Sequence, residues 1–216
     1  MRYRLAIFDF DGTLADSFPW FTSALNGAAR RFGFRVIDAA EGEALRALGP
    51  REIMRRLEVP GWKLPWIIRH LRREKQAVAG TLPLFPGVPD LLAALPAGGA
   101  RLAIVSSDSE ASIRATLGPG LAGLIGHYGT SASLFGKPRK LRAALRQTGI
   151  PAREAIYIGD ELRDAEAARA AGMDFGAVAW GYATRAALAG TQPALLFDSP
   201  AEIIARFAEA VSCPGP

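Results

Sequence analysis

Acidic side chains follow directly after short apolar runs in this sequence, in a pattern suited to binding a metal ion and attacking phosphorus. Asp9 and Asp11 come straight after the apolar residues 4–8. Asp160 comes just after the apolar residues 155–158, with Asp164 four positions on. Several carboxylates cannot cluster in ionised form without a cation, and ligands that are all hard oxygens favour Mg²⁺. An aspartate beside such an ion is a competent nucleophile, and a second one can act as general acid and base.

A hydroxyl group and an ammonium group are placed in a similar way. Ser106 and Ser107 follow the apolar residues 102–105, and Lys137 lies in a Gly-Lys-Pro turn ahead of a helical pattern. In an open parallel sheet, ligands bind beyond the carboxyl ends of the strands. We therefore expect these groups and the carboxylates to converge on one rim of a sheet.

The elements that must position these groups alternate along most of the chain. Continuous apolar runs are typical of strands in a parallel sheet that is covered on both faces. The expected strands cover residues 4–8, 102–105, 155–158 and 175–179, with a weaker one at 124–128. The expected helices between them cover residues 89–95, 110–117, 138–147 and 161–171. This alternation predicts an α/β fold with a doubly wound parallel sheet. Asp108 is expected to be the N-cap of the second of these helices.

Residues 16–80 break the alternation. Apolar residues repeat there at helical spacing in four stretches, and no stretch has a convincing strand pattern. Asp38 followed by Glu41 is typical of a capping box at the start of one of these helices. We therefore expect an α/β core formed by residues 1–14 and 83–216, with an inserted all-helical unit at residues 15–82.

Together, these features resemble the four motifs of the haloacid dehalogenase-like hydrolase superfamily. The motifs occur in the family's order as Asp9-Phe10-Asp11-Gly12-Thr13, Ser106, Lys137 and Gly159-Asp160-Glu161-Leu162-Arg163-Asp164. The resemblance covers essentially the whole chain. It implies a Rossmann-like core, and the helical insertion resembles the cap domain of phosphoglycolate-phosphatase-like members.

The resemblance also implies catalytic roles. Asp9 would be the nucleophile, and Asp11 would be the general acid and base. Ser106 would donate a hydrogen bond to the phosphoryl group that is transferred. Lys137 would neutralise the charge of that group and of the nucleophile.

A magnesium site is implied by the same motifs. Mg²⁺ would be held by Asp9, the backbone carbonyl of Asp11, and Asp160. Asp164 would support the ion directly or through a water molecule.

Five further residues are candidates for substrate binding. Gly12 would let the backbone approach a phosphate closely, and Thr13 belongs to the same motif. Ser107 stands where the family commonly has asparagine. Arg46 and Arg51 lie at an expected helix–helix turn that would overhang the site.

The net charge of +5 is confined to the insertion. Residues 15–82 contain 12 Lys/Arg and 7 Asp/Glu, whereas the rest of the chain contains 14 of each. This excess either attracts an anionic ligand or only solvates helix faces. Because no nucleic-acid recognition motif accompanies it, we expect no nucleic acid as a partner. The family resemblance implies a small phosphorylated metabolite instead.

The composition favours a globular protein of a reducing compartment. Half of the residues are apolar, and Cys213 is the only cysteine, which excludes a disulfide framework. No stretch is long and apolar enough to span a membrane, and the first ten residues lack the pattern of a secretory signal. We expect a cytoplasmic protein that is a monomer or a dimer and does not bind membranes.

The expected function is that of a magnesium-dependent phosphatase acting on a small phosphate monoester, phosphoglycolate-like or a sugar phosphate, through an aspartyl-phosphate on Asp9. A sugar phosphomutase would share the core and cap, but such relatives often carry a histidine where this chain has residues 18–21, Phe-Pro-Trp-Phe. A dehalogenase would lack the second aspartate, Asp11. A non-catalytic binding protein would be expected to have lost at least one motif residue.

Overall fold

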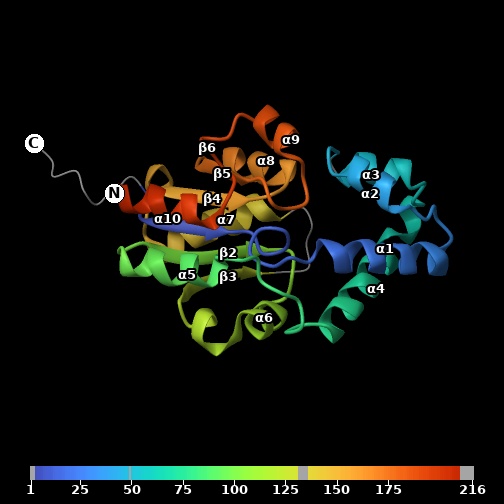
Figure 1. Ribbon diagram of the computed structural model, residues 1–216, viewed down its shortest axis with the longest axis horizontal. Coiled ribbons are helices and arrows are strands. Elements are labelled where there is room, and N and C mark those ends of the chain that lie inside the picture. The colour runs from blue at the N-terminus through green and yellow to red at the C-terminus, as the bar shows by residue number, and fades with distance from the viewer. Residues whose placement is uncertain (1–2, 49, 131–135, 210–216) are drawn as a thin grey trace, which may run out of the picture.

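A computed structural model of the protein describes residues 3–48, 50–130 and 136–209, so Cys213 lies outside the described residues. A six-stranded sheet in the order β3-β2-β1-β4-β5-β6 forms its centre, and every neighbouring pair of strands is parallel (Figure 1). The strands are β1 (Leu5–Phe8), β2 (Arg101–Ser106), β3 (Ile125–Thr130), β4 (Ala155–Gly159), β5 (Asp174–Val178) and β6 (Leu195–Phe197). The strand order reverses beside β1. The carboxyl ends of β1, β2 and β4 therefore lie next to one another at the switch point of the sheet.

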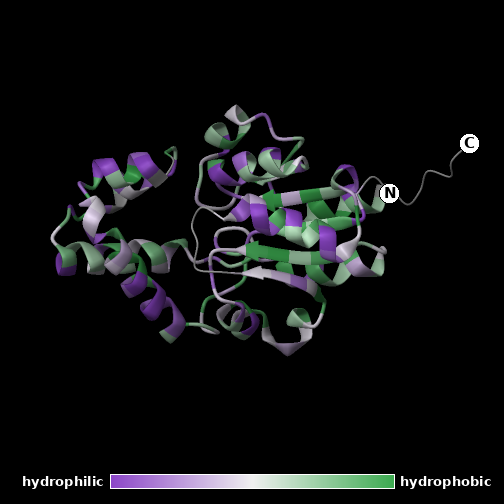
Figure 2. Ribbon diagram, turned by 180° about the vertical axis from the view of Figure 1, so that it is seen from behind, coloured by the Kyte–Doolittle hydropathy of each residue, from purple (hydrophilic) through white to green (hydrophobic). Residues whose placement is uncertain are grey.

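Both faces of the sheet are buried, which explains the continuous apolar runs. In β1, Leu5 and Ile7 belong to one hydrophobic cluster, whereas Ala6 and Phe8 belong to another on the opposite face. All four are completely buried. The strands are accordingly among the most hydrophobic parts of the molecule (Figure 2).

Three helices cover each face of the sheet. The cluster that contains Phe8 includes residues of α5 (Val88–Ala97), α6 (Glu110–Ala122) and α10 (Pro200–Glu209). The cluster that contains Ile7 includes residues of α7 (Lys137–Thr148), α8 (Leu162–Ala171) and α9 (Arg185–Gly190). This arrangement confirms the predicted doubly wound α/β fold.

The predicted elements of the core are all present, and three more are added. β6, α9 and α10 were not predicted; β6 and α9 are only three and six residues long. The prediction that Asp108 caps α6 is wrong. The N-cap is Ser109, whose Oγ accepts a hydrogen bond from the Ser112 amide at 3.1 Å. Asp108 has other partners, described below.

Four α-helices lie between β1 and α5. They are α1 (Phe18–Phe32), α2 (Ala39–Leu45), α3 (Pro50–Arg56) and α4 (Leu64–Ala77), with a short 3₁₀ turn, η1 (Gly61–Lys63), before the last. Asp38 caps α2 as expected, since its carboxylate accepts from the Glu41 amide at 2.8 Å. We call α1–α4 the helical insertion.

The helical insertion has a hydrophobic cluster of its own, which includes Ala28, Phe34, Leu57 and Ile67. It extends beyond the carboxyl ends of the strands (Figures 1 and 2). The division into two domains at residues 15 and 82 stays a prediction. In the part of the chain that the structure describes, no helix combines the length and the apolar character needed to cross a membrane.

Candidate active site

Three carboxylates meet at the switch point of the sheet. Asp9 follows β1, Asp160 follows β4, and Asp164 lies in the first turn of α8. One carboxylate oxygen of each lies within 4.8 Å of those of the other two, and all three residues are buried. The adjacency of β1 and β4 brings Asp9 and Asp160 together, although 150 residues separate them in the chain.

Lys137 is the positive charge within this group. It is the first residue of α7 and is buried, and its Nζ donates to Asp9 Oδ2 at 2.6 Å and to Asp164 Oδ1 at 2.5 Å. One ammonium therefore faces three carboxylates, which leaves a buried excess of negative charge if all three are ionised.

The pKa values reflect this excess. Burial raises the pKa of Asp160 well above its ordinary value, and the negative charges of Glu161, Asp164 and Asp9 raise it further. Burial also raises the pKa of Asp164 to about 6, although Lys137 opposes this shift. A divalent cation would supply the missing positive charge. An all-oxygen ligand set suits Mg²⁺, so Asp9, Asp160 and Asp164 fit the expected ion.

Asp160 is held in place from both sides. The Thr13 hydroxyl donates to its Oδ1 at 2.7 Å, and the Tyr182 amide donates to its Oδ2 at 2.8 Å. Gly12 has a φ of +75°, and a Cβ atom there would lie 2.1 Å from Asp160 Oδ2. Gly12 and Thr13 were expected to bind substrate. In the structure their contacts orient a carboxylate of the acidic cluster.

Asp164 joins the site to the start of α8. Its Oδ2 accepts from the Glu161 amide at 3.1 Å and completes a capping box with the Glu161 side chain. Its Oδ1 accepts from Lys137 and, at 3.2 Å, from the Tyr157 hydroxyl. These bonds fix the carboxylate orientation before any ligand binds.

Ser106 presents an available donor at the end of β2. Its Oγ accepts from the Asp108 amide at 3.1 Å, which leaves the hydroxyl hydrogen to donate to a ligand. Its carbonyl accepts from Lys140 Nζ at 2.6 Å. Burial, followed by the nearby charge of Lys137, lowers the pKa of Lys140 to about 8. Ser107 is partly buried, and no hydrogen bond of its side chain is found among the described residues.

Asp11 lies apart from the three clustered carboxylates and pairs with a residue that the sequence reasoning missed. Its Oδ2 accepts from the buried Nζ of Lys75, which α4 contributes from the helical insertion. Lys75 also lies 2.7 Å from Asp108 Oδ2. Burial raises the pKa of Asp11 above its ordinary value, although Lys75 opposes this shift. One signal was present in the sequence: Lys75 interrupts the apolar stripe of α4 at a position, four after Leu71, where another apolar residue would be expected.

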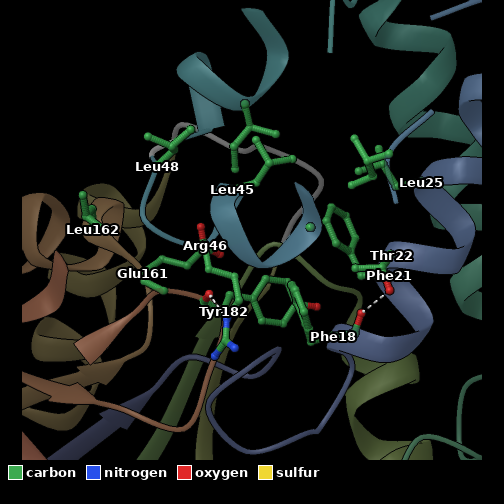
Figure 3. Close-up of a pocket in the computed structure, with 14 residues that line it drawn as sticks. Phe18, Phe21, Thr22, Leu25, Leu45, Arg46, Leu48, Glu161, Leu162 and Tyr182 are labelled. Atoms are coloured by element: carbon green, nitrogen blue, oxygen red, sulfur yellow. Dashed lines mark hydrogen bonds between the residues drawn. The ribbon is translucent and has the colours of Figure 1, made fainter. Parts of the chain in front are cut away.

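The two arginines proposed for substrate binding have other surroundings. Arg46 donates to the carbonyls of Gly181 at 2.8 Å and Tyr182 at 2.9 Å, and to Glu43 at 2.7 Å. Figure 3 shows it turned toward Tyr182. Arg51 is exposed. The structure therefore does not bring either guanidinium to the carboxylate cluster.

An apolar pocket of about 70 Å³ lies beside the site (Figure 3). It is enclosed by α1 and α2 on one side and by the core segments around Glu161 and Tyr182 on the other. The rings of Phe18 and Phe21 pack against Tyr182 at centroid distances of 5.1 and 5.6 Å. None of the clustered carboxylates lines this pocket, so it adjoins the charged site without being part of it.

The chain is similar to known proteins in both sequence and fold. Residues 6–178 match the model of the family described as haloacid dehalogenase-like hydrolase. A protein of Synechococcus elongatus named phosphoglycolate phosphatase is 36% identical over 199 residues, which cover 92% of this chain and 94% of that protein.

Two solved structures share the fold over nearly their whole length. A predicted phosphatase from Clostridium acetobutylicum superposes with a TM-score of 0.83 at 22% identity, covering 97% of this chain and 100% of that one. CbbY from Rhodobacter sphaeroides in complex with phosphate superposes with a TM-score of 0.72 at 25% identity, covering 93% of this chain and 96% of that one.

Proposed function

Because the chain belongs to the haloacid dehalogenase-like hydrolase family, we propose that it is a magnesium-dependent phosphatase that hydrolyses a small phosphate monoester through an aspartyl-phosphate. The observation that carries the proposal is the cluster of Asp9, Asp160 and Asp164 around Lys137 at the switch point of the sheet, with the Ser106 hydroxyl at the neighbouring strand end. Each group has a role in phosphoryl transfer.

The first half of the reaction transfers the phosphoryl group to Asp9. One Asp9 oxygen accepts from Lys137, and a carboxylate oxygen of Asp9 attacks phosphorus while the bond to the leaving oxygen breaks. Ser106 donates its remaining hydrogen to a phosphoryl oxygen. Mg²⁺, held by Asp9, Asp160 and Asp164, would neutralise negative charge on the carboxylates and the phosphoryl oxygens.

Asp11 serves both halves of the reaction. Its raised pKa suits a general acid that protonates the leaving alcohol. The buried Oδ1 atom has no hydrogen-bond partner among the described residues, which is consistent with a role toward a ligand. In the second half, the Asp11 carboxylate takes a proton from water, and the resulting nucleophile cleaves the aspartyl-phosphate to release inorganic phosphate.

The relative from Synechococcus elongatus supports phosphoglycolate as the first substrate to test, with sugar phosphates next. The mutase alternative receives no support from the start of α1. Phe18 and Phe21 pack on Tyr182 there and carry no titratable group.

The test is a turnover screen with Mg²⁺ over phosphoglycolate, sugar phosphates, nucleotides and p-nitrophenyl phosphate. The Asp9→Asn protein, purified in parallel, measures any contaminating phosphatase. We expect phosphate release from at least one small monoester well above that background. If no ester is hydrolysed faster than by Asp9→Asn, the proposed function is wrong.

A further inference from the structure

Lys75 is buried at the junction between the helical insertion and the core. Its side chain is 10% exposed, although it extends from α4, a helix of the insertion. Both of its carboxylate partners, Asp11 and Asp108, belong to the core. Burying an ammonium group is costly unless it is well paired, so this position requires an electrostatic explanation beyond packing.

Asp108 is a fixed anchor for this lysine. Its Oδ1 accepts from the Ser109 amide at 2.7 Å, and its Oδ2 accepts from the Ser112 hydroxyl at 3.0 Å. Both donors belong to the start of α6. The ammonium is therefore held between a rigid carboxylate and the carboxylate of Asp11.

The position of Lys75 relative to the reaction follows from its contact with Asp11. A general acid must approach the leaving oxygen to hydrogen-bond distance. Lys75 contacts the other oxygen of this carboxyl group, so its ammonium then lies within about 8 Å of the leaving oxygen, which is two hydrogen-bond lengths plus the spacing of the two carboxyl oxygens. In phosphoglycolate the carboxylate is attached directly to the ester carbon, only a few bonds from the leaving oxygen, so it would fall within reach of Lys75.

The ammonium also has the capacity for such a ligand. It carries three N–H donors, and two carboxylates of the described residues accept from it. The two arginines considered for substrate binding are less suited to bind this carboxylate. The Arg46 guanidinium already donates to two backbone carbonyls and to Glu43, and Arg51 is exposed.

We propose that Lys75 is the specificity-determining residue of the site and binds the carboxylate of a leaving group that is a small hydroxy acid. This inference rests on the proposed phosphatase function and deepens it. In the complex, the substrate carboxylate takes the third donor of Lys75. The bound acid then lies with its ester oxygen toward Asp11 and its phosphorus toward Asp9.

The experiment compares phosphoglycolate with ethyl phosphate, which has the same two-carbon leaving group but no carboxylate. The variant is Lys75→Met, which keeps most of the side-chain stem and removes the charge. Arg73→Met removes the same charge from an exposed position of the same helix and is the matched control. Kinetic constants are measured with saturating Mg²⁺ for both esters.

We expect wild-type kcat/KM to favour phosphoglycolate by at least about tenfold. Lys75→Met is expected to lower kcat/KM for phosphoglycolate by about 10–100-fold, mainly through KM, since a charge-assisted hydrogen bond is lost. Some loss with ethyl phosphate is expected as well, because Lys75 contacts Asp11, but it is expected to be about tenfold smaller than the loss with phosphoglycolate. Arg73→Met is expected to behave as wild type with both. Lys75→Arg, which keeps the charge, is expected to recover part of the preference.

Three results would overturn the inference. One is equal loss with both esters, which would make Lys75 a residue that acts through Asp11 or through docking of α4. The second is no loss with either. The third is a wild-type enzyme that does not prefer phosphoglycolate, a result that needs no variant. In each of these cases, a protein that still hydrolyses ethyl phosphate or p-nitrophenyl phosphate is still a phosphatase. Failure of the Lys75 inference can therefore be told apart from failure of the proposed phosphatase function.

Discussion

Asp9 lies within hydrogen-bond distance of Lys137 and within a cluster of two further carboxylates. Asp9→Asn replaces the proposed nucleophile, a carboxylate, by an amide with nearly the same shape. We expect turnover to fall to the background of the assay while the circular dichroism spectrum and the midpoint of thermal unfolding stay close to wild type. Near wild-type turnover by the folded variant would contradict the covalent mechanism.

The loss of rate on replacing Asp11 is expected to depend on the leaving group of the substrate. Loss of a general acid typically costs about 10²–10⁴ in rate. For Asp11→Asn we expect a loss of this size with an alkyl phosphate. With p-nitrophenyl phosphate, whose leaving group barely needs a proton, the rate of phosphoryl transfer to Asp9 should fall by a clearly smaller factor. The two kcat values, measured side by side, give the answer; equal losses would show that Asp11 acts through structure.

We expect Thr13 to affect the reaction through its hydrogen bond to Asp160. Thr13→Val removes the hydroxyl that donates to Asp160 Oδ1 and keeps the branched shape. Partners that orient a metal ligand are worth about 10–100-fold in metal affinity, so we expect the Mg²⁺ concentration for half-maximal activity to rise by that factor. Thr13→Ser keeps the hydroxyl and is the control. An unchanged Mg²⁺ requirement in Thr13→Val would show that the hydrogen bond does not support metal binding.

At the scale of the elements, Arg46 connects α2 of the helical insertion to the core segment around Tyr182. Its guanidinium donates to the carbonyls of Gly181 and Tyr182, and its own carbonyl accepts from the Thr184 amide at 3.2 Å. The sequence suggested a selective contact with a charged substrate. The structure instead favours a contact that holds α2 against the core.

Arg46→Ala is therefore expected to lower kcat/KM by about tenfold for phosphoglycolate and for p-nitrophenyl phosphate alike, because hydrogen bonds that dock the insertion are lost. Arg51→Ala, at an exposed position, is expected to change neither by more than about twofold. If Arg46→Ala impaired only phosphoglycolate, Arg46 would be a substrate ligand and the docking interpretation would be wrong.

Across the whole molecule, we expect the buried carboxylates to make metal binding and stability interdependent. In the metal-free protein, burial raises the pKa of Asp164 to about 6 from an ordinary value of 3.8, and raises the pKa of Asp160 well above the same ordinary value. Between about pH 4 and pH 6, the folded state therefore binds more protons than the unfolded state. The stability that the protons contribute is present below about pH 4 and is lost as pH rises through about 6.

Magnesium should replace those protons. We expect Mg²⁺ to raise the midpoint of thermal unfolding by several degrees at pH 7.5 and by much less at pH 5, where protons compete for the same oxygens. Differential scanning calorimetry with EDTA or with excess Mg²⁺ measures both. An Asp160→Asn protein is the control and is expected to lose most of the response. A shift of equal size at both pH values would place the ion elsewhere.

The sequence by itself determined the sheet and the residues at its strand ends. An apolar run followed at once by Asp9, or ending at Ser106, is a local pattern, and local patterns specify buried strands because both faces must be apolar. Parallel strands then end on the same edge, so the convergence of Asp9 and Asp160 follows from the fold class. The motif resemblance supplied the expected roles. β6 and α9 escaped prediction because short elements carry too little periodicity.

Only the tertiary structure decided which residues of the helical insertion contact the core. Lys75 and Asp11 are 64 residues apart, and Arg46 and Tyr182 are 136 apart. No local spacing relates such residues, and the charge of the insertion as a whole did not show which of its 12 basic side chains reaches the site. That choice depends on how α1–α4 pack onto the strand ends, because a rotation of one helix face by a single position would point a different side chain at Asp11.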